Sequence, residues 1–183
     1  MTDFLAMLEK IIRMLAYGAW HAAAESSDLG MKKFPGGYIC LYHTGEKRGL
    51  ISEIEAFPKE KNAARSYHLD AVRRKVDVLM KHPGALFASD VDGVSDGGLR
   101  FREYIIVVTG YRSKLNLSIA VSAAGMLSMV GKSLSEKSDP EMNVLTKKAL
   151  LRGVPGPLSF KGHPVDHIVG KEYSLIHYKM SPK

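Results

Sequence analysis

Two aspartates, Asp90 and Asp92, give the stretch 86–94, LFASDVDGV, the residue types of a catalytic site. Paired carboxylates can divide the roles of nucleophile and general acid, or hold a divalent cation. Val94 stands where a calcium loop needs its third oxygen ligand, which argues against a cation loop of that kind. Aspartate and glycine also favour tight turns, so the residues by themselves favour a surface turn over a catalytic pair.

The same stretch resembles the first motif of the haloacid-dehalogenase-like phosphatases, and the apolar run 104–109 resembles their second motif. The resemblance implies a Mg²⁺-dependent phosphatase with Asp90 as nucleophile, Asp92 as acid/base and Thr109 as phosphate ligand. Only residues 94–104 separate the two motifs, which is too short for the crossover helix that two parallel strands need. The phosphatase is therefore kept as an alternative, and whether the protein is an enzyme stays open.

A second candidate site lies at the start of a helix that we predict over residues 59–80. Lys59 and Asn62 would lie in its first turn, where free backbone N–H groups favour an anion, and Arg65 would follow at the rim. Thr109 and Gly110 end an apolar strand and would offer a hydroxyl group and a close backbone approach. We therefore predict a pocket for a small anionic ligand at these five residues.

Residues with metal-ligating chemistry gather near the C-terminus in GHPVDHIVG, where they are His163, Asp166 and His167. Imidazole and carboxylate groups are common metal ligands. Pro164 disfavours a regular helix, so the spacing does not place the two imidazoles on one helical face. We predict loop histidines without a metal and keep these three residues as the metal or haem-iron candidates.

The elements that must position these sites follow from hydrophobic periodicity and from glycine and proline breaks. The predicted helices span 3–26, 59–80, 115–130 and 141–152, and the predicted strands span 36–43, 50–56 and 104–110. Residues 172–180 are expected to form either a last strand or an arm. The run 104–110 is apolar on both faces, which predicts an interior strand. A hairpin followed by helices predicts an α+β fold with a mostly antiparallel sheet.

Two expectations concern single residues in or next to the predicted helices. Lys75 falls on the apolar side of helix 59–80, and we expect its stem to lie on apolar surface with its charge in water. Ser113 or Asn116 is expected to cap the helix over 115–130.

The character of the chain changes after Gly131, so we predict a ligand-binding domain over 1–130. A C-terminal extension over 131–183 would pack on the same domain or on a partner subunit.

Three short motifs rich in small residues follow one another along the chain. They are Ala56, Lys59, Asn62, Ala63 and Ala64 in AFPKEKNAAR, Gly97 and Gly98 in GGLRF, and Thr109 and Gly110 in YIIVVTGY. In this order the chain resembles the GlcG/HbpS-like family of glycolate-operon and haem-binding proteins over about residues 3–130, although Asn62 stands where that family has a threonine. The resemblance implies a five-stranded antiparallel sheet flanked by helices in a profilin/PAS-like layer arrangement, often in an oligomer, with haem as one possible cofactor.

The overall composition narrows the range of partners. The net charge is +7, which favours anionic ligands, but no basic run is interleaved with aromatics, which argues against nucleic-acid binding. Cys40 is the single cysteine, so no internal disulfide can form. Glu9, Lys10 and Arg13 interrupt the apolar N-terminal run, which argues against a signal peptide or a membrane span. A cytoplasmic location is the expectation.

Taken together, the sequence predicts a small α+β protein that binds an anionic small molecule and forms a homo-oligomer. One alternative is the phosphatase that uses Asp90 and Asp92. The other is an oligomeric protein-interaction module whose C-terminal arm exchanges between subunits.

Overall fold

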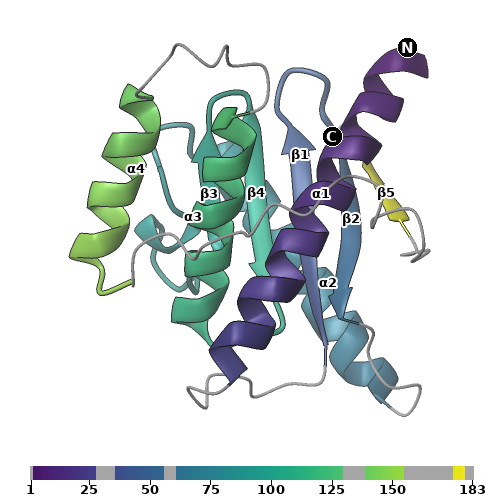
Figure 1. Ribbon diagram of the computed structural model, residues 1–183, viewed down its shortest axis with the longest axis horizontal. Coiled ribbons are helices and arrows are strands. Elements are labelled where there is room, and N and C mark those ends of the chain that lie inside the picture. Colours follow the sequence, from purple (N-terminus) through teal and green to yellow (C-terminus); the bar gives the residue numbers. More distant parts are fainter. Residues whose placement is uncertain (1, 28–35, 56–60, 130–138, 155–174, 180–183) are drawn as a thin grey trace.

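The computed structural model describes residues 2–27, 36–55, 61–129, 139–154 and 175–179, as an antiparallel sheet with helices on both faces (Figure 1). The helices are α1 (Thr2–Ser27), α2 (Asn62–Lys81), α3 (Ser113–Met129) and α4 (Pro140–Leu151), with a short 3₁₀ turn at Ala88–Asp90. The strands are β1 (Gly37–His43), β2 (Arg48–Glu55), β3 (Gly98–Phe101), β4 (Tyr104–Thr109) and β5 (Leu175–Lys179).

The strands are ordered β3-β4-β1-β2-β5, and each neighbouring pair is antiparallel. The predicted α+β class with an antiparallel sheet is therefore confirmed. The predicted interior position of the run 104–110 is confirmed too, since β4 lies between β3 and β1. The short strand β3 was not predicted, because GLRF carries few of the residues that mark a strand.

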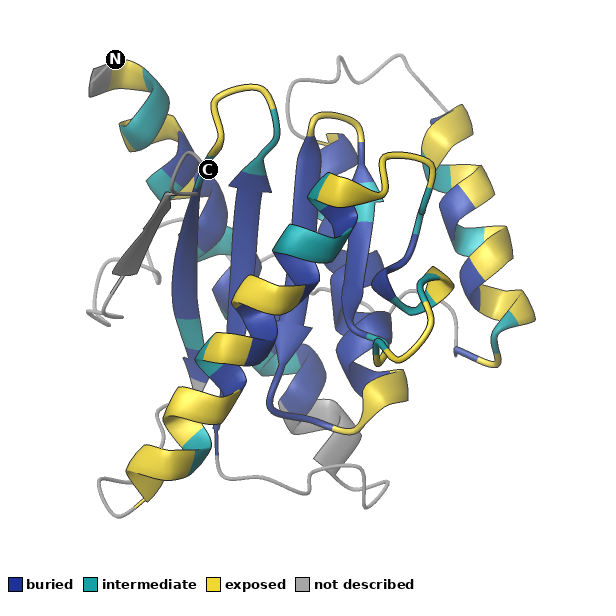
Figure 2. Cartoon of the chain, turned by 180° about the vertical axis from the view of Figure 1, so that it is seen from behind, coloured by how far each residue is buried: buried dark blue, intermediate teal, exposed yellow. Residues whose placement is uncertain are grey.

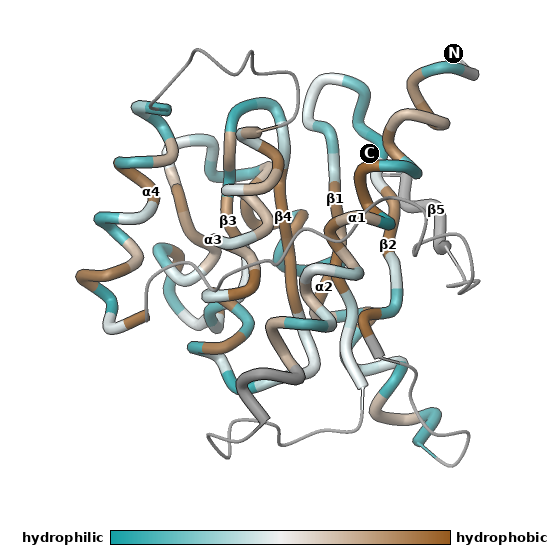
Figure 3. Tube along the Cα trace, viewed as in Figure 1, coloured by the Kyte–Doolittle hydropathy of each residue, from teal (hydrophilic) through white to brown (hydrophobic). Residues whose placement is uncertain are grey.

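One face of the sheet is covered by α1 and α3. Leu8, Ile12, Leu15 and Ala19 recur at helical spacing on α1 and are fully buried against Ile39, Leu41, Leu50 and Ile106 of the strands. Helix α3 is apolar almost all around, as its hydrophobic colour in Figure 3 shows. Such a helix is stable only when neighbours cover it, and here the sheet, α1 and α4 do so.

The opposite face is covered by α2. Figure 2 shows this helix with its exposed side toward solvent and the buried strands behind it. Val72, Val76 and Leu79 of α2 pack on Cys40 and Val107, among other strand residues. The strands are therefore apolar on both faces because helices cover both.

Lys75 differs from its sequence expectation. It lies on the sheet side of α2 and is only 2% exposed, so the prediction that its charge reaches water is wrong. Its Nζ instead donates to the backbone carbonyl of Asp96 at 2.5 Å. The side chain of Lys75 lies inside the α2–sheet interface, so its amine does not reach solvent. The backbone carbonyl of Asp96, which lies before β3, accepts the hydrogen bond that water would otherwise accept.

Of the two expected cap residues, Ser113 and Asn116, the second is excluded, because α3 begins at Ser113 and Asn116 lies inside the helix. Its side chain is buried and folds back on Tyr111, accepting from the backbone N–H at 3.1 Å and donating to the carbonyl at 2.8 Å. The side chain therefore fixes the turn between β4 and α3.

Helix α4 lies outside α3 and beside the edge strand β3 (Figure 1). Asp139 caps it by accepting from the backbone N–H groups of Glu141 and Met142, and Pro140 occupies a first-turn position where its missing N–H has no effect. Gly153, with φ +71°, follows the helix and ends it. In the part of the chain that the structure describes, no helix has the length and apolar character needed to cross a membrane.

Candidate functional site

The sequence-predicted anion pocket is only partly open in the structure. Asn62 is the first residue of α2 and is exposed, and Arg65 lies one turn further, with its Nη2 3.5 Å from Oε1 of Glu53. Lys59 lies outside the described residues. Of the predicted pocket residues, the exposed ones that the structure describes are therefore one amide and one arginine that already faces a carboxylate.

The other two predicted pocket residues, Thr109 and Gly110, are buried. The Thr109 hydroxyl lies 3.4 Å from the backbone carbonyl of His68 and donates to it. Gly110 packs directly on Gly36 and Gly37. The structure thus brings the strand end close to α2, but it uses these two residues for packing and leaves no face of them toward solvent.

The two aspartates of LFASDVDGV have different surroundings. Oδ2 of Asp90 accepts from the backbone N–H groups of Leu86 and Phe87, at 3.0 and 2.8 Å, and Oδ1 pairs with Arg152. Asp92 is exposed, and among the described residues no hydrogen bond or ion pair is formed by its side chain. Asp90 therefore stabilises a turn, as the sequence favoured.

Phosphatase chemistry finds no support in this geometry. The two motifs would have to lie on neighbouring strands, but Phe87 bridges to Leu99 of β3, so β3 lies between the first motif and β4. No group of three metal-ligating residues occurs within the described ranges. His163, Asp166 and His167 lie outside those ranges.

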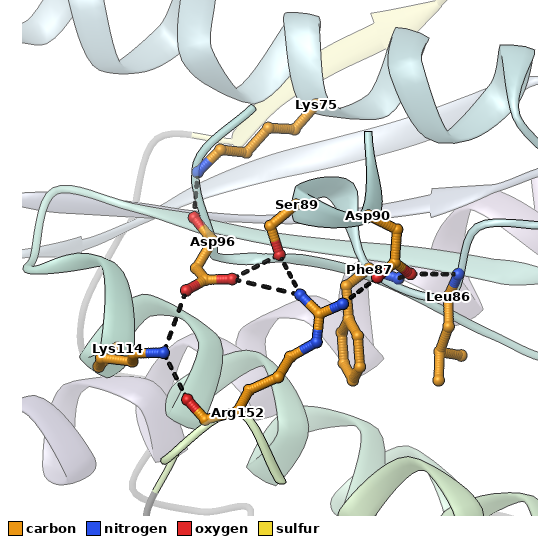
Figure 4. Close-up of polar contacts among 8 residues, drawn as sticks. All are labelled: Lys75, Leu86, Phe87, Ser89, Asp90, Asp96, Lys114 and Arg152. Carbon is orange, nitrogen blue, oxygen red and sulfur yellow. Dashed lines mark hydrogen bonds and ion pairs between the residues drawn. The ribbon is translucent and has the colours of Figure 1, made fainter. Parts of the chain in front are cut away.

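A polar network joins the 88–96 loop to three helices (Figure 4). Ser89 Oγ donates to Asp96 Oδ1 at 2.5 Å and accepts from Arg152 Nη1 at 2.7 Å. Asp96 also lies 3.7 Å from Lys114 Nζ at the start of α3. Lys75 of α2 binds the carbonyl of the same aspartate. The loop is therefore held by cations from α2, α3 and the end of α4.

A groove of about 550 Å³ with a partly apolar lining opens beside α4. We call it the α4 groove. It is bounded by the segment 83–86, by residues 100–102 at the end of β3, and by α4. Leu86, Phe101, Val144 and Leu145 supply apolar surface, and Lys148 supplies a cation. A groove of this kind can accept an apolar group and orient a charged one.

The N-terminal end of the α4 groove is closed by an ion pair. Arg102 Nη2 lies 2.6 Å from Asp139 Oδ2, and the Asp139 side chain is only 6% exposed. Arg102 occupies the two-residue turn between β3 and β4 with φ +54°, a conformation that residues other than glycine seldom adopt. The strained turn thus directs a guanidinium group across the groove to the cap of α4.

Asp139→Ala is expected to lower the free energy of unfolding by about 2 kcal/mol, because it removes both a helix cap and the partner of Arg102. Asp139→Asn is the matched control. An asparagine still caps α4 but carries no charge, so about half of the loss is expected with it. Urea unfolding measures both variants. Equal losses with alanine and asparagine would show that the cap contributes nothing.

The residues that line the α4 groove were not identified from the sequence. A signal was present: Val144, Lys148 and Leu151 follow one another at spacings of four and three on α4, beside the buried stripe of Leu145 and Ala149. Val144 is 52% exposed and Leu151 is 80% exposed. A helix that carries apolar residues outside its buried stripe exposes apolar surface that the hydrophobic core of the protein does not cover.

Comparison of this chain with known protein families, with curated proteins and with solved structures found no match. The resemblance to the GlcG/HbpS-like family therefore stays a prediction from the motifs.

Proposed function

We propose that this protein binds a small anionic amphipathic molecule, and that the ligand occupies the α4 groove. The observation that supports this proposal most directly is the lining of the groove, where apolar side chains lie beside the exposed Lys148; Glu141, the one carboxylate of the lining, lies two helical turns away from this lysine on α4. The sequence predicted a small-ligand-binding α+β protein with an anionic ligand. The proposal keeps the ligand class and moves the site from the start of α2 to α4.

The apolar part of the ligand is inferred from Val144. This side chain is 52% exposed on the rim, and the buried Phe101 and Leu145 lie deeper in the groove lining. Burying apolar surface contributes about 0.8 kcal/mol for each methylene group. An alkyl or aryl group of modest size would therefore gain several kcal/mol by covering this surface.

The anionic part of the ligand is inferred from Lys148. Within the described residues, its ammonium group has no ion-pair or hydrogen-bond partner. Arg102, by contrast, is neutralised by Asp139. Lys148 also lines a second hollow next to the groove, so its ammonium group is accessible from both. A carboxylate or phosphate group would thus meet an unpaired cation.

Haem, which the family resemblance implies, fits the described lining less well. Haem iron is usually held by histidine, cysteine, methionine or tyrosine. None of these is among the described residues that line the α4 groove. We therefore favour an amphiphile without a metal. A Soret band that appears when hemin is added, and that an alkyl phosphate abolishes by competition, would contradict this choice.

Octyl phosphate is the probe that tests the proposal, with octanol and inorganic phosphate as its two halves. We expect octyl phosphate, kept below its micelle concentration, to bind at least about tenfold more tightly than either half, because only the intact probe uses both surfaces. Isothermal titration calorimetry measures the three affinities. Equal binding of octanol and octyl phosphate would refute an anionic ligand.

Lys148→Glu is expected to weaken octyl phosphate binding about tenfold or more, since it replaces an attractive charge with a repulsive one. Lys147→Glu is the matched control: it makes the same charge change at the neighbouring exposed lysine, which does not line the groove. Comparable weakening by both variants would indicate a general charge effect and would contradict the assignment of Lys148 to the site.

The oligomeric state remains a prediction from the family resemblance. Light scattering of the full chain would measure its mass. Truncation before β5 would then test whether the C-terminal segment holds subunits together, which is the alternative of an interaction module.

A further inference from the structure

Arg152 lies in a second hollow of about 340 Å³ that shares Gly84, Leu86 and Lys148 with the α4 groove. Its guanidinium group stacks over the ring of Phe87, with 4.6 Å from Cζ to the ring centroid. Figure 4 shows the guanidinium between Ser89 and Asp90. The only other cation that lines this hollow is Lys148.

The ion pair between Arg152 and Asp90 can be exchanged at low cost. The two side chains are 32% and 29% exposed, and ion pairs of such exposure contribute little to stability. Oδ2 of Asp90 would keep its hydrogen bonds from the backbone N–H groups of Leu86 and Phe87. Loss of Arg152 would therefore leave a carboxylate that is still hydrogen-bonded and partly solvated.

The guanidinium group itself would stay in place if Asp90 released it. Ser89 accepts from its Nη1 at 2.7 Å, Asp96 lies 3.9 Å from the same atom, and the stacking on Phe87 does not involve Asp90. A planar guanidinium group held in this way can bind a carboxylate or a phosphate through two parallel N–H groups.

We infer that Arg152 is a second anion-binding residue of the α4 groove, and that Asp90 and the anionic group of a ligand compete for it. This inference rests on the proposed function. It specifies the ligand further: its anionic group has at least two oxygens, and it lies between Lys148 and Arg152. Asp90 thus lowers the affinity of the groove.

The test is the affinity of Asp90→Asn for octyl phosphate, measured by isothermal titration calorimetry at low salt. Asparagine has the same shape and can still accept from Leu86 and Phe87, so we expect the fold to be kept, which thermal unfolding checks. The expected affinity is about three- to tenfold higher than that of the wild type, because the competitor has lost its charge.

Asp92→Asn is the matched control. It removes the same charge from an exposed side chain that lies two positions after Asp90. Its affinity is expected to stay within about twofold of the wild type. In the double variant Asp90→Asn/Arg152→Gln the gain should disappear, because the contested guanidinium is absent.

The outcomes separate the two proposals. If the wild type binds octyl phosphate and Asp90→Asn binds no better than Asp92→Asn, the role of Arg152 is refuted and the proposed function stands. A gain that persists without Arg152 refutes the role of this residue as well. If neither the wild type nor any of these variants binds the probe, both the proposed function and this inference fail.

Discussion

Replacing Gly110 with alanine is expected to lower the free energy of unfolding by about 4 kcal/mol. Gly110 has φ +107°, which residues with a side chain seldom adopt. A Cβ atom there would lie 2.5 Å from Cα of Gly37 and would also collide with the carbonyl oxygen of Gly36. Both obstacles are backbone atoms of the chain that leads into β1, so no side chain can turn away to relieve the clash.

Gly93→Ala is the matched control for this substitution. Gly93 has φ +78°, and a Cβ atom there would meet nothing within 4 Å. Its alanine variant should therefore show only the backbone cost, about 1 kcal/mol. Urea unfolding of both variants separates the two contributions. If Gly110→Ala is no more destabilising than Gly93→Ala, the close approach between the β1 entry and the β4 end has no energetic importance.

The second large effect is expected from Lys75 as the pH rises. Burial lowers the pKa of Lys75 to about 8 from its ordinary 10.5; Asp96 opposes this shift in part, and Arg74 adds to it. Between these two values the unfolded chain binds a proton that the folded chain does not bind. Stability therefore increases with pH through this window. The contribution of this one group amounts to about 3 kcal/mol.

Lys75→Met removes the titrating group and keeps an unbranched side chain at the α2–sheet interface. The free energy of unfolding of the wild type, minus that of Lys75→Met, should rise by about 3 kcal/mol from near pH 7 to above pH 10. Urea unfolding at several pH values measures this difference.

The difference between the two proteins is the useful quantity, because other groups titrate in the same region. Burial raises the pKa of Tyr38 and of Tyr104, which lowers stability at high pH in both proteins alike. Lys147→Met is the control, because it makes the same lysine-to-methionine substitution at an exposed position. A wild-type-minus-Lys75→Met difference that stays constant over the whole range would contradict the burial of a titrating amine.

Much of the fold could be predicted because its signals are local. The α1 helix was predicted over 3–26 and observed over Thr2–Ser27, and the α2 helix was predicted over 59–80 and observed over Asn62–Lys81. Helical periodicity and the breaks around it depend on residues a few positions apart, which a sequence displays directly. The interior position of β4 followed in the same way from a run that is apolar on both faces.

The candidate site could not be predicted in the same way. Asp90 was recognised as a turn residue, but its partner Arg152 lies 62 positions away. Lys75 was recognised as a charge on an apolar face, but the carbonyl that accepts from it lies on a loop 21 positions away. Nothing in the sequence near either residue indicates which distant segment will face it.

The sequence by itself determined the helices, most of the strands, the antiparallel α+β class and the role of LFASDVDGV as a turn. Hydrogen-bonding preference and hydrophobic periodicity act over a few residues, so these features leave a signal in short stretches of the sequence. Only the tertiary structure decided that Lys75 is buried, that Thr109 and Gly110 are used for packing, and that α4 lies beside β3 to form a groove. These features depend on which surfaces meet, and that choice minimises the exposed apolar surface of the whole chain rather than of any one segment.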